Sequence, residues 1–317
     1  MRLLLPILPL VPAAVFCVLS VRGQDPAPSG DGEVAPVSFV FYNLRNYLAM
    51  DRRIDGEYRE NAPKPDNEIE ALIEGIVATR PDILGVCEVG DPSYLEDLRV
   101  RLKSAGLDLP HTELVRSRSG IDRNLALLSR FPIVERHSRN DYTYDLEGKN
   151  LLFQRGVLDV TVAPRPEYRL RLVGLHLKSK REVREADQAM MRLNEARLAR
   201  THIDAIFRSQ PGINLLVFGD FNDLRIEPPV KALQGRFGRD DYLDSLMLED
   251  VYGFRWTHHW FYADSYSRFD YVLFSEGISP EIDRDRSFIH HWDEWDTASD
   301  HRPLVVRLIP EDRRADK

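Results

Sequence analysis

Short runs of apolar residues, each closed by a polar side chain, recur along the whole chain. The run within Ile213–Asp223 (INLLVFGDFND) has five apolar residues before Gly219 and Asp220. A run of this length is too short for a helix and indicates a strand that is buried on both faces. The same pattern predicts strands over Val37–Asn43, Asp82–Glu88, Asn124–Ser129, Val157–Val162, Tyr168–Leu177, Arg268–Ser275 and Pro303–Ile309.

Apolar residues at helical spacing predict three helices between these strands. Asn67–Arg80 is the clearest, because its apolar residues recur at i, i+3, i+4, i+7 and i+8. Ser93–Ala105 carries a weaker pattern, and Glu182–Arg208 carries a longer one with Met190 on its apolar face. The first strand, helix and second strand imply a right-handed crossover within one sheet. Met50–Pro65 is dominated by charges and prolines and is predicted to be a surface loop.

The polar residues that close the runs are the first indication of function. Asp220 and Asn222 are two positions apart, which in extended backbone places both side chains on the same side. Gly, Asp and Asn are also ordinary turn formers, so this stretch alone is equally consistent with a strand-to-turn junction. Six such positions exist, however, at or near the ends of predicted strands: Asn43, Glu88, His176, Asp220 with Asn222, Asp270, and Asp300 with His301.

These strand ends are expected to form one site. In a layered α/β protein the ends of the strands converge on one rim, which is the usual place for chemistry. No Cys/His spacing typical of zinc occurs. The predicted site is instead rich in carboxylate oxygens, which favour a hard cation such as Mg²⁺, Mn²⁺ or Ca²⁺.

The bulk composition is that of a soluble globular protein, apart from the N-terminus. Of the 317 residues, 43% are hydrophobic and 30% are charged, without an internal repeat or an interdomain linker. Met1–Ser20 has one Arg followed by an uncharged apolar run, which is typical of an export signal cleaved before Gln24. The alternative is a membrane anchor, although the run barely reaches spanning length and contains prolines. We therefore expect a signal over residues 1–23, a flexible lead-in over 24–36, one α/β domain over 37–310 and a tail over 311–317.

Charge and cysteine content refine this interpretation. Loss of residues 1–23 would remove Arg2 and Arg22 and no acid, so the net charge of −8 would become −10. The overall field then disfavours strong binding to nucleic acid but leaves room for a local basic groove. Cys87 would be the remaining cysteine, so we expect no internal disulfide and a small buried thiol. We expect the mature protein to be a monomer in the periplasm or outside the cell, without stable membrane insertion.

Seven motifs, in order, resemble those of the endonuclease/exonuclease/phosphatase superfamily of phosphoesterases. They are YNLRNY, PDILGVCE, LALLSRFPI, GLHLKS, VFGDFND, RFDYVLFS and SDHRPL, and they extend from about Ser38 to Leu308. One such motif would be a weak signal, whereas the ordered set is highly specific. The resemblance implies a four-layered α/β sandwich, in which two mostly antiparallel sheets pack face to face with helices outside.

The resemblance also implies roles for the matching residues. Asn43 and Glu88 resemble metal-site residues, with Asp300 joining or supporting them. Asp220 resembles the carboxylate that orients the attacking water, and Asn222 resembles the group that holds the phosphoryl. Mg²⁺, or else Mn²⁺ or Ca²⁺, is the implied cofactor.

The two histidines resemble a pair on opposite sides of the phosphoester. His301 matches the histidine on the attacking side, with Asp270 fixing its tautomer through a hydrogen bond. His176 matches the histidine that helps the leaving oxygen depart, although no acidic partner for it can be identified in the sequence. A strand histidine that binds a backbone carbonyl is the alternative for His176. Arg155 matches an arginine that contacts phosphate in the deoxyribonuclease branch, and Lys178 closes the same motif as His176.

The sequence favours a nuclease over related phosphoesterases. Arg45, Arg123, Arg155, Lys178 and Lys180 fall in or next to site motifs of an acidic chain, which suggests a track for phosphates. Abasic-site endonucleases carry a carboxylate where this chain has Arg45, so that repair role is disfavoured.

Other substrates remain open at this point. The alternatives are a phospholipid or sphingomyelin phosphodiesterase, a sugar-phosphate phosphatase, and a non-catalytic binding protein on the same scaffold. Phe254–Tyr262 and Trp292–Trp295 are rich in aromatic and His residues. These segments could form a substrate or lipid platform, but we favour a small satellite core under loops.

Overall fold

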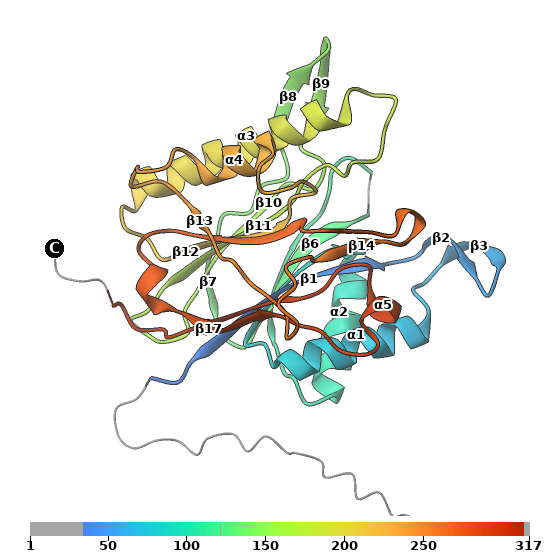
Figure 1. Ribbon diagram of the computed structural model, residues 1–317, viewed down its shortest axis with the longest axis horizontal. Coiled ribbons are helices and arrows are strands. Elements are labelled where there is room, and N and C mark those ends of the chain that lie inside the picture. The colour runs from blue at the N-terminus through green and yellow to red at the C-terminus, as the bar shows by residue number, and fades with distance from the viewer. Residues whose placement is uncertain (1–33, 121, 314–317) are drawn as a thin grey trace, which may run out of the picture. The chain divides into compact units, whose positions relative to one another are not determined.

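Two β-sheets packed face to face, with helices on both outer faces, make up the described part of the protein (Figure 1). The computed structural model describes residues 34–120 and 122–313. The predicted signal over 1–23, most of the lead-in and the end of the tail lie outside these residues. The order helix, sheet, sheet, helix confirms the predicted four-layered α/β sandwich.

Each sheet has six strands. The first contains, in spatial order, β17 (Ile282–Ile289), β18 (Leu304–Leu308), β1 (Val37–Tyr47), β4 (Ile83–Val89), β6 (Asn124–Ser129) and β5 (His111–Val115). The second contains β13 (Asp244–Ser245), β16 (Asp270–Phe274), β12 (Leu215–Asp220), β11 (Leu170–His176), β10 (Val157–Val162) and β7 (Ile133–Arg136). β1 with β4 and β11 with β12 run parallel, and the other strand pairs of the described residues are antiparallel.

The core between the sheets follows from the two-residue alternation of the strands. Phe39 and Phe41 of β1 point toward the second sheet, where they meet Phe218 of β12 at ring-centroid distances of 4.9 and 5.5 Å. A Cβ at Gly85 or Gly174 would lie within 2.8 Å of the Phe218 ring. These two glycines therefore leave the space that the ring fills between the sheets.

Helices cover the outer faces of both sheets. α1 (Asp66–Thr79) and α2 (Pro92–Ser104) pack on the first sheet, and α3 (Gln188–Ser209) and α4 (Pro228–Gln234) pack on the second. α5 (Trp295–Ala298) is a single turn beside α1 (Figure 1). Among the helices of the described residues, we find none with the length and apolar character needed to span a membrane.

Helix α3 differs from its predicted form at its start and on its buried face. It begins at Gln188 rather than Glu182, because the preceding residues form bends. Met190, which we predicted on the apolar face, is exposed. The buried face instead includes two charged side chains, Arg192 and Glu195. A pattern of apolar residues cannot locate a helix face that is partly charged.

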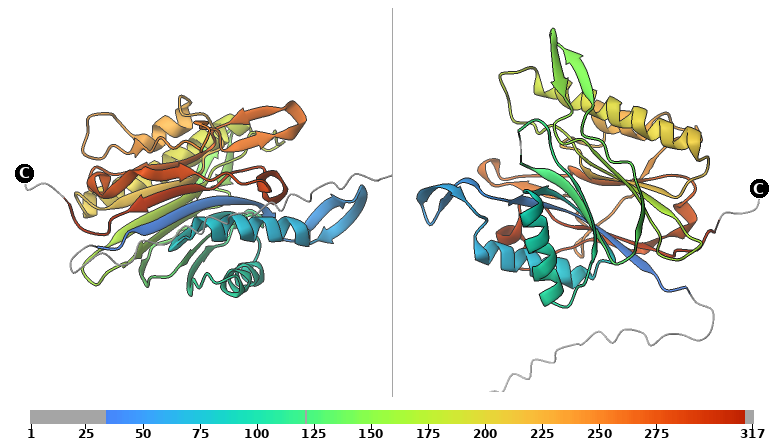
Figure 2. Two further views of the ribbon diagram at one scale, coloured as in Figure 1. Left: turned by 60° about the horizontal axis from the view of Figure 1, so that its bottom comes forward. Right: turned by 180° about the vertical axis from the view of Figure 1, so that it is seen from behind.

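Three two-stranded hairpins extend the sandwich. They are β2 (Met50–Ile54) with β3 (Glu57–Ala62), β8 (Thr143–Leu146) with β9 (Lys149–Leu152), and β14 (His258–Trp260) with β15 (Ser265–Ser267). The first protrudes from the body of the protein (Figure 2). The prediction of a loop over Met50–Pro65 was wrong. β3 is almost entirely exposed and β2 is only partly buried on one face, so neither strand shows the alternation of apolar and polar residues that marks a buried strand.

Candidate active site

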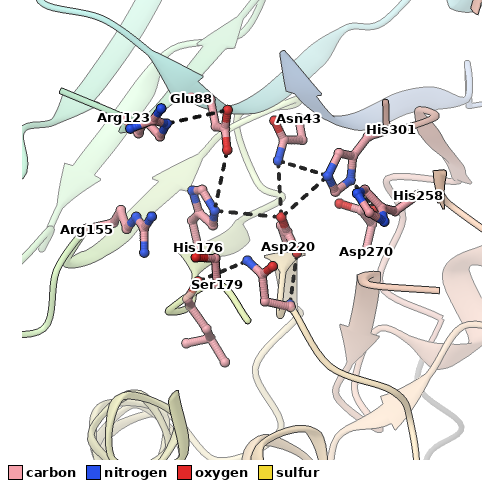
Figure 3. Close-up of polar contacts among 12 residues, drawn as sticks. Asn43, Glu88, Arg123, Arg155, His176, Ser179, Asp220, His258, Asp270 and His301 are labelled. Carbon is pink, nitrogen blue, oxygen red and sulfur yellow. Dashed lines mark hydrogen bonds and ion pairs between the residues drawn. The ribbon is translucent and has the colours of Figure 1, made fainter. Parts of the chain in front are cut away.

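The candidate site lies where the core between the sheets becomes polar (Figure 3). In β12, Leu216 and Phe218 point into this core, and Asp220 is the next residue of the same row. His176 of β11 and Asp270 of β16 end the inward rows of the two neighbouring strands. The strand register places both directly beside Asp220. Strand pairing alone therefore brings three ionisable side chains together.

Glu88 and Asn43 reach the site from the first sheet. Asn43 follows Phe41 in the inward row of β1, whereas regular alternation after the inward-facing Cys87 would turn Glu88 outward. Glu88 has a φ of 63° and stands at an irregularity in the pairing of β4 with β6. This bulge turns its carboxylate toward His176, and Asn46 donates its backbone N–H to the same carboxylate at 3.0 Å.

His301, Asp270 and Asp220 form a buried network. Nδ1 of His301 lies 2.7 Å from Oδ2 of Asp270, and Nε2 lies 3.7 Å from Oδ2 of Asp220. Asn43 donates its Nδ2–H to the same oxygen of Asp220 at 3.1 Å. The bond to Asp270 fixes the imidazole, so a neutral ring would carry its proton on Nδ1 and present Nε2 to Asp220.

The network retains protons that exposed groups would lose. Burial lowers the pKa of His301, but the negative charges of Asp270 and Asp220 outweigh burial and raise the pKa to about 10. Burial also holds the pKa of Asp220 well above its usual range, and repulsion from Asp270 and Glu88 adds to burial while the charge of His301 opposes it. Shifted pKa values of this kind are typical of catalytic sites.

His176 has a different environment on the other side of Asp220 (Figure 3). Its Nε2 lies 3.7 Å from Asp220 and 3.9 Å from Glu88, whereas its buried Nδ1 has no hydrogen-bond partner among the described residues. Burial lowers the pKa of His176 well below the usual value, and the positive charge of Arg155 is the second cause of this shift. Neither an acidic partner nor a backbone carbonyl therefore fixes Nδ1.

The residues present fit a divalent cation. Glu88 is free to offer Oε1, because its other oxygen accepts the Asn46 N–H, and repulsion between the carboxylates of Glu88, Asp220 and Asp270 is relieved by bound positive charge. Asp220, Asp270 and His301 offer ligand atoms within 4.8 Å of one another and form a second possible donor set. The short bond between Asp270 and His301 already uses one ligand atom of each residue. Oδ1 of Asn43 accepts the backbone N–H of Arg45 at 3.0 Å but keeps a second lone pair, so we favour Glu88 and Asn43 as the metal-holding residues.

The other predicted residues lie around this centre. We predicted that Asn222 continues the extended backbone of β12, and this prediction was wrong. Its φ is 52°, and its backbone N–H donates to Oδ1 of Asp220 at 2.9 Å. Asp300 lies 3.9 Å from the Nε of Arg45, at the exposed rim. The ammonium of Lys178 donates to the carbonyl groups of Ser179 and Arg181 at 3.0 and 2.8 Å, so its contact with phosphate stays a prediction.

One histidine of the site, His258, was not predicted from the sequence. The His258 ring lies against His301 at a centroid distance of 4.7 Å with the two planes tilted by 54°, and its Nε2 lies 3.9 Å from Asp300. It comes from the aromatic segment that we assigned to a satellite core. Its position could not be predicted, because a short hairpin brings His258 to the site and the sequence of that hairpin has no apolar pattern.

Comparison with known proteins assigns this chain to a class of enzymes. Residues 40–301 match the Endonuclease/Exonuclease/phosphatase family, and the chain belongs to this family. Its members are metal-dependent phosphoester hydrolases, so the protein is an enzyme of this type. No curated protein matches the sequence.

Several solved structures share the fold. A family protein from Bacteroides vulgatus has a TM-score of 0.61 at 16% identity, covering 87% of this chain and 100% of that one. The human Nocturnin catalytic domain has a TM-score of 0.59 at 18% identity, with 86% and 93% covered. Sphingomyelinase C from Streptomyces griseocarneus has a TM-score of 0.55 at 17% identity, with 86% and 99% covered. At these identities the likeness establishes the fold and leaves the substrate open.

Proposed function

We propose that the protein is an exported, divalent-metal-dependent phosphodiesterase that cleaves nucleic acid by means of an activated water. Arg155 carries the proposal. Arg155 is 5% exposed, its guanidinium stands beside His176 (Figure 3), and it forms no ion pair with a carboxylate of the described residues. Its Nη1 donates to Oε1 of Gln154 at 3.0 Å, which is a neutral partner. A buried cation without a negatively charged partner is costly, and a bound phosphodiester would supply the missing negative charge.

The attacking side is formed by Asp220 and His301. Asp220 orients a water molecule, and His301, held by Asp270, accepts the proton that this water loses. His301 must be neutral for this step. Positive charge bound near the carboxylates of Glu88 and Asp220 would lower its raised pKa toward neutrality.

The leaving side is formed by His176 and Arg155. His176 donates a proton to the leaving oxygen, and Arg155 binds a phosphoryl oxygen beside it. The depressed pKa of His176 would rise when a phosphodiester brings negative charge next to it. Glu88 and Asn43 would hold the cation, which supplies positive charge to the phosphoryl oxygens.

Local positive charge supports nucleic acid as the substrate. Arg123 lies on the same side of the site as Arg155 (Figure 3), and its Nε donates to Asn46 at 2.6 Å. Arg45, whose side chain is nearly half exposed, extends the cationic rim on the side of Asp300. Because the chain as a whole carries a net charge of −8, this rim is a local exception that suits a polyanion.

The decisive test compares substrates at matched Mg²⁺. Plasmid DNA and RNA should be cleaved, the rate should fall steeply with salt, and Arg155→Ala should raise KM and lower kcat/KM by about 10-fold or more. Arg139→Ala removes an exposed arginine paired with Asp141 and serves as the matched control. Efficient hydrolysis of sphingomyelin liposomes with untouched DNA and RNA would contradict the nucleic-acid assignment.

One observation favours a lipid phosphodiesterase as the second candidate. Trp260, Phe261 and Tyr262, at the tip of the β14–β15 hairpin, are more than half exposed. Below the tip, His259 stacks on Tyr266 at a centroid distance of 4.4 Å, so the base of the hairpin forms a small aromatic cluster. The tip itself remains exposed and apolar. An exposed apolar tip beside an active site can enter a membrane interface. In the liposome arm of the test, replacing the three tip residues by Ser should abolish hydrolysis if this candidate holds.

Export rests on the N-terminal pattern. Met1–Ser20 combines one Arg with an uncharged apolar run, and Gln24 follows a suitable cleavage position. N-terminal sequencing of protein recovered outside the cytoplasm should begin near Gln24. An intact N-terminus in a membrane fraction would support an anchor instead.

A further inference from the structure

A buried acid on α3 contacts two of the segments that carry the site. Glu195 is fully buried, and its Oε1 accepts the backbone N–H of Gln154 at 3.0 Å. Its Oε2 accepts the backbone N–H of Lys178 at 2.6 Å. Gln154 directly precedes Arg155, and Lys178 follows His176 by two residues. One carboxylate thus joins the two segments that hold the leaving side of the site.

The carboxylate of Glu195 has no close counter-ion in the part of the chain that the structure describes. No ion pair involves this side chain within the described residues, and a buried carboxylate of this kind is retained only at a cost. Burial raises the pKa of Glu195 to about 7, although the positive charge of Arg155 and the two backbone hydrogen bonds oppose burial. A neutral amide would be less costly for packing alone, so the acid points to a task that needs two acceptor oxygens.

Arg192, one turn earlier, completes the contact from the same helix face. Its Nη1 donates to the carbonyl of Lys178 at 3.1 Å, and its Nε donates to Oδ2 of Asp223 at 2.9 Å. Asp223 directly follows Asn222. The charged face of α3 therefore reaches three segments, which carry Arg155, His176 and Asn222.

We propose that Glu195 is a positioning residue, which fixes the backbone beside His176 relative to the backbone beside Arg155. The two groups then face the same phosphodiester. This role rests on the proposed function, in which His176 protonates the leaving oxygen and Arg155 binds the phosphoryl. A displacement of about 1 Å at such a pair is enough to lower turnover by about 100-fold.

The test uses Glu195→Gln and two leaving groups. The amide nitrogen of Gln must face one of the two backbone N–H groups, so one hydrogen bond is lost while the volume is kept. An oligonucleotide has an alkoxide leaving group that needs a proton, whereas bis-p-nitrophenyl phosphate releases a p-nitrophenolate that does not. We expect kcat to fall about 30-fold on the oligonucleotide and less than about 3-fold on the nitrophenyl ester, with KM raised on both.

Asp159→Asn is the control for loss of a buried acid. Asp159 lies in β10, pairs with Arg171 at 2.6 Å and contacts His202, near the far end of α3. This variant should lower thermal stability and leave both kcat values and both KM values unchanged. If Glu195→Gln does not fold, Glu195→Asp keeps the charge, shortens its reach and should show the same dependence on the leaving group.

The outcomes separate this proposal from the proposed function. Equal losses on both substrates, or wild-type values on both, would overturn the positioning role. A wild-type enzyme that hydrolyses the nitrophenyl ester but no oligonucleotide would refute the nucleic-acid assignment. In that case an unchanged KM of Glu195→Gln for the ester would still overturn the positioning role, and a raised KM would support it.

Discussion

Of the three histidines of the site, His301 and His176 flank Asp220, and their neighbours favour the charged form of one and the neutral form of the other. His301 bonds to Asp270 at 2.7 Å and faces Asp220, so its imidazolium form is favoured. Nδ1 of His176 has no hydrogen-bond partner among the residues that the structure describes, and the ring is buried near Arg155, so its neutral form is favoured. The free protein is therefore poised with its proton on the attacking side, and binding of cation and substrate must shift both equilibria before the reaction.

Asp270→Asn should show how strongly this hydrogen bond holds the proton. Because the folded pKa of His301 is raised from 6.5 to about 10, its contribution to stability is present below about pH 6.5 and is lost as pH rises through about 10. In EDTA, we expect the variant to be about 3 kcal/mol less stable than wild type at pH 6. Urea unfolding at pH 6, 8 and 10 should show this difference shrinking as pH rises, and a difference independent of pH would contradict the assignment.

The sequence predicts some residues of the site better than others for a geometric reason. Asp220 and His176 continue the inward-facing rows of regular strands, so the two-residue alternation of a strand predicts that their side chains point into the site. Glu88 points into the site because of a left-handed residue at a bulge, and no count of positions could show that. Its place at the end of a predicted strand put it near the expected site, and the resemblance of its motif indicated its role. Neither strand alternation nor a matching motif indicated the place of His258.

At the scale of elements, the parallel pair β11–β12 supports the chemistry. Leu175 pairs with Gly219 and His176 with Asp220, so one register sets the spacing of two site residues. Gly219 has a φ of 150°, and a Cβ there would lie 1.9 Å from the carbonyl oxygen of Leu175. The two strands can approach this closely only because position 219 has no side chain.

Gly219→Ala should therefore reduce both stability and activity. We expect a loss of about 3 kcal/mol in the free energy of unfolding, since the clash is with backbone that cannot turn away. Gly106→Ala, at another positive φ but in open space, should cost about 1 kcal/mol and leave turnover intact. Chemical denaturation and turnover of the same preparations measure both effects. Equal costs in the two variants would show that the contact with Leu175 is unimportant.

Element type was predictable where burial imposes a pattern. Strands such as Asp82–Glu88 and the helix over Asn67–Arg80 were placed to within a few residues, because one face of each must be apolar. The hairpin formed by β2 and β3 was read as a loop, because its exposed strands carry charges on both faces. Exposed elements leave no hydrophobic signal, and here they include the hairpin that brings His258 to the site.

At the scale of the whole molecule, the sandwich concentrates negative charge at one end of its core. Asp220, Asp270 and Glu88 come from both sheets, and their mutual repulsion contributes to the raised pKa of Asp220. Folding thus brings together charges that the unfolded chain keeps apart. A cation that binds only the folded site should therefore stabilise the entire protein.

Removal and return of divalent cation should change stability and activity together. EDTA should abolish phosphodiesterase activity, and Mg²⁺ or Mn²⁺ should restore it and raise Tm. At a cation concentration of 100 times Kd, the free energy of unfolding should increase by about 3 kcal/mol. Glu88→Gln should lose most of this Tm increase and about 100-fold of turnover, because it removes a charged ligand while keeping the shape of the side chain.

Two controls accompany this experiment. Glu135→Gln replaces an exposed acid outside the site and should respond to Mg²⁺ like wild type. NaCl of equal ionic strength separates binding from screening in a thermal-shift experiment. Full turnover in EDTA, or equal Tm increases for wild type and Glu88→Gln, would place the cation elsewhere than at Glu88.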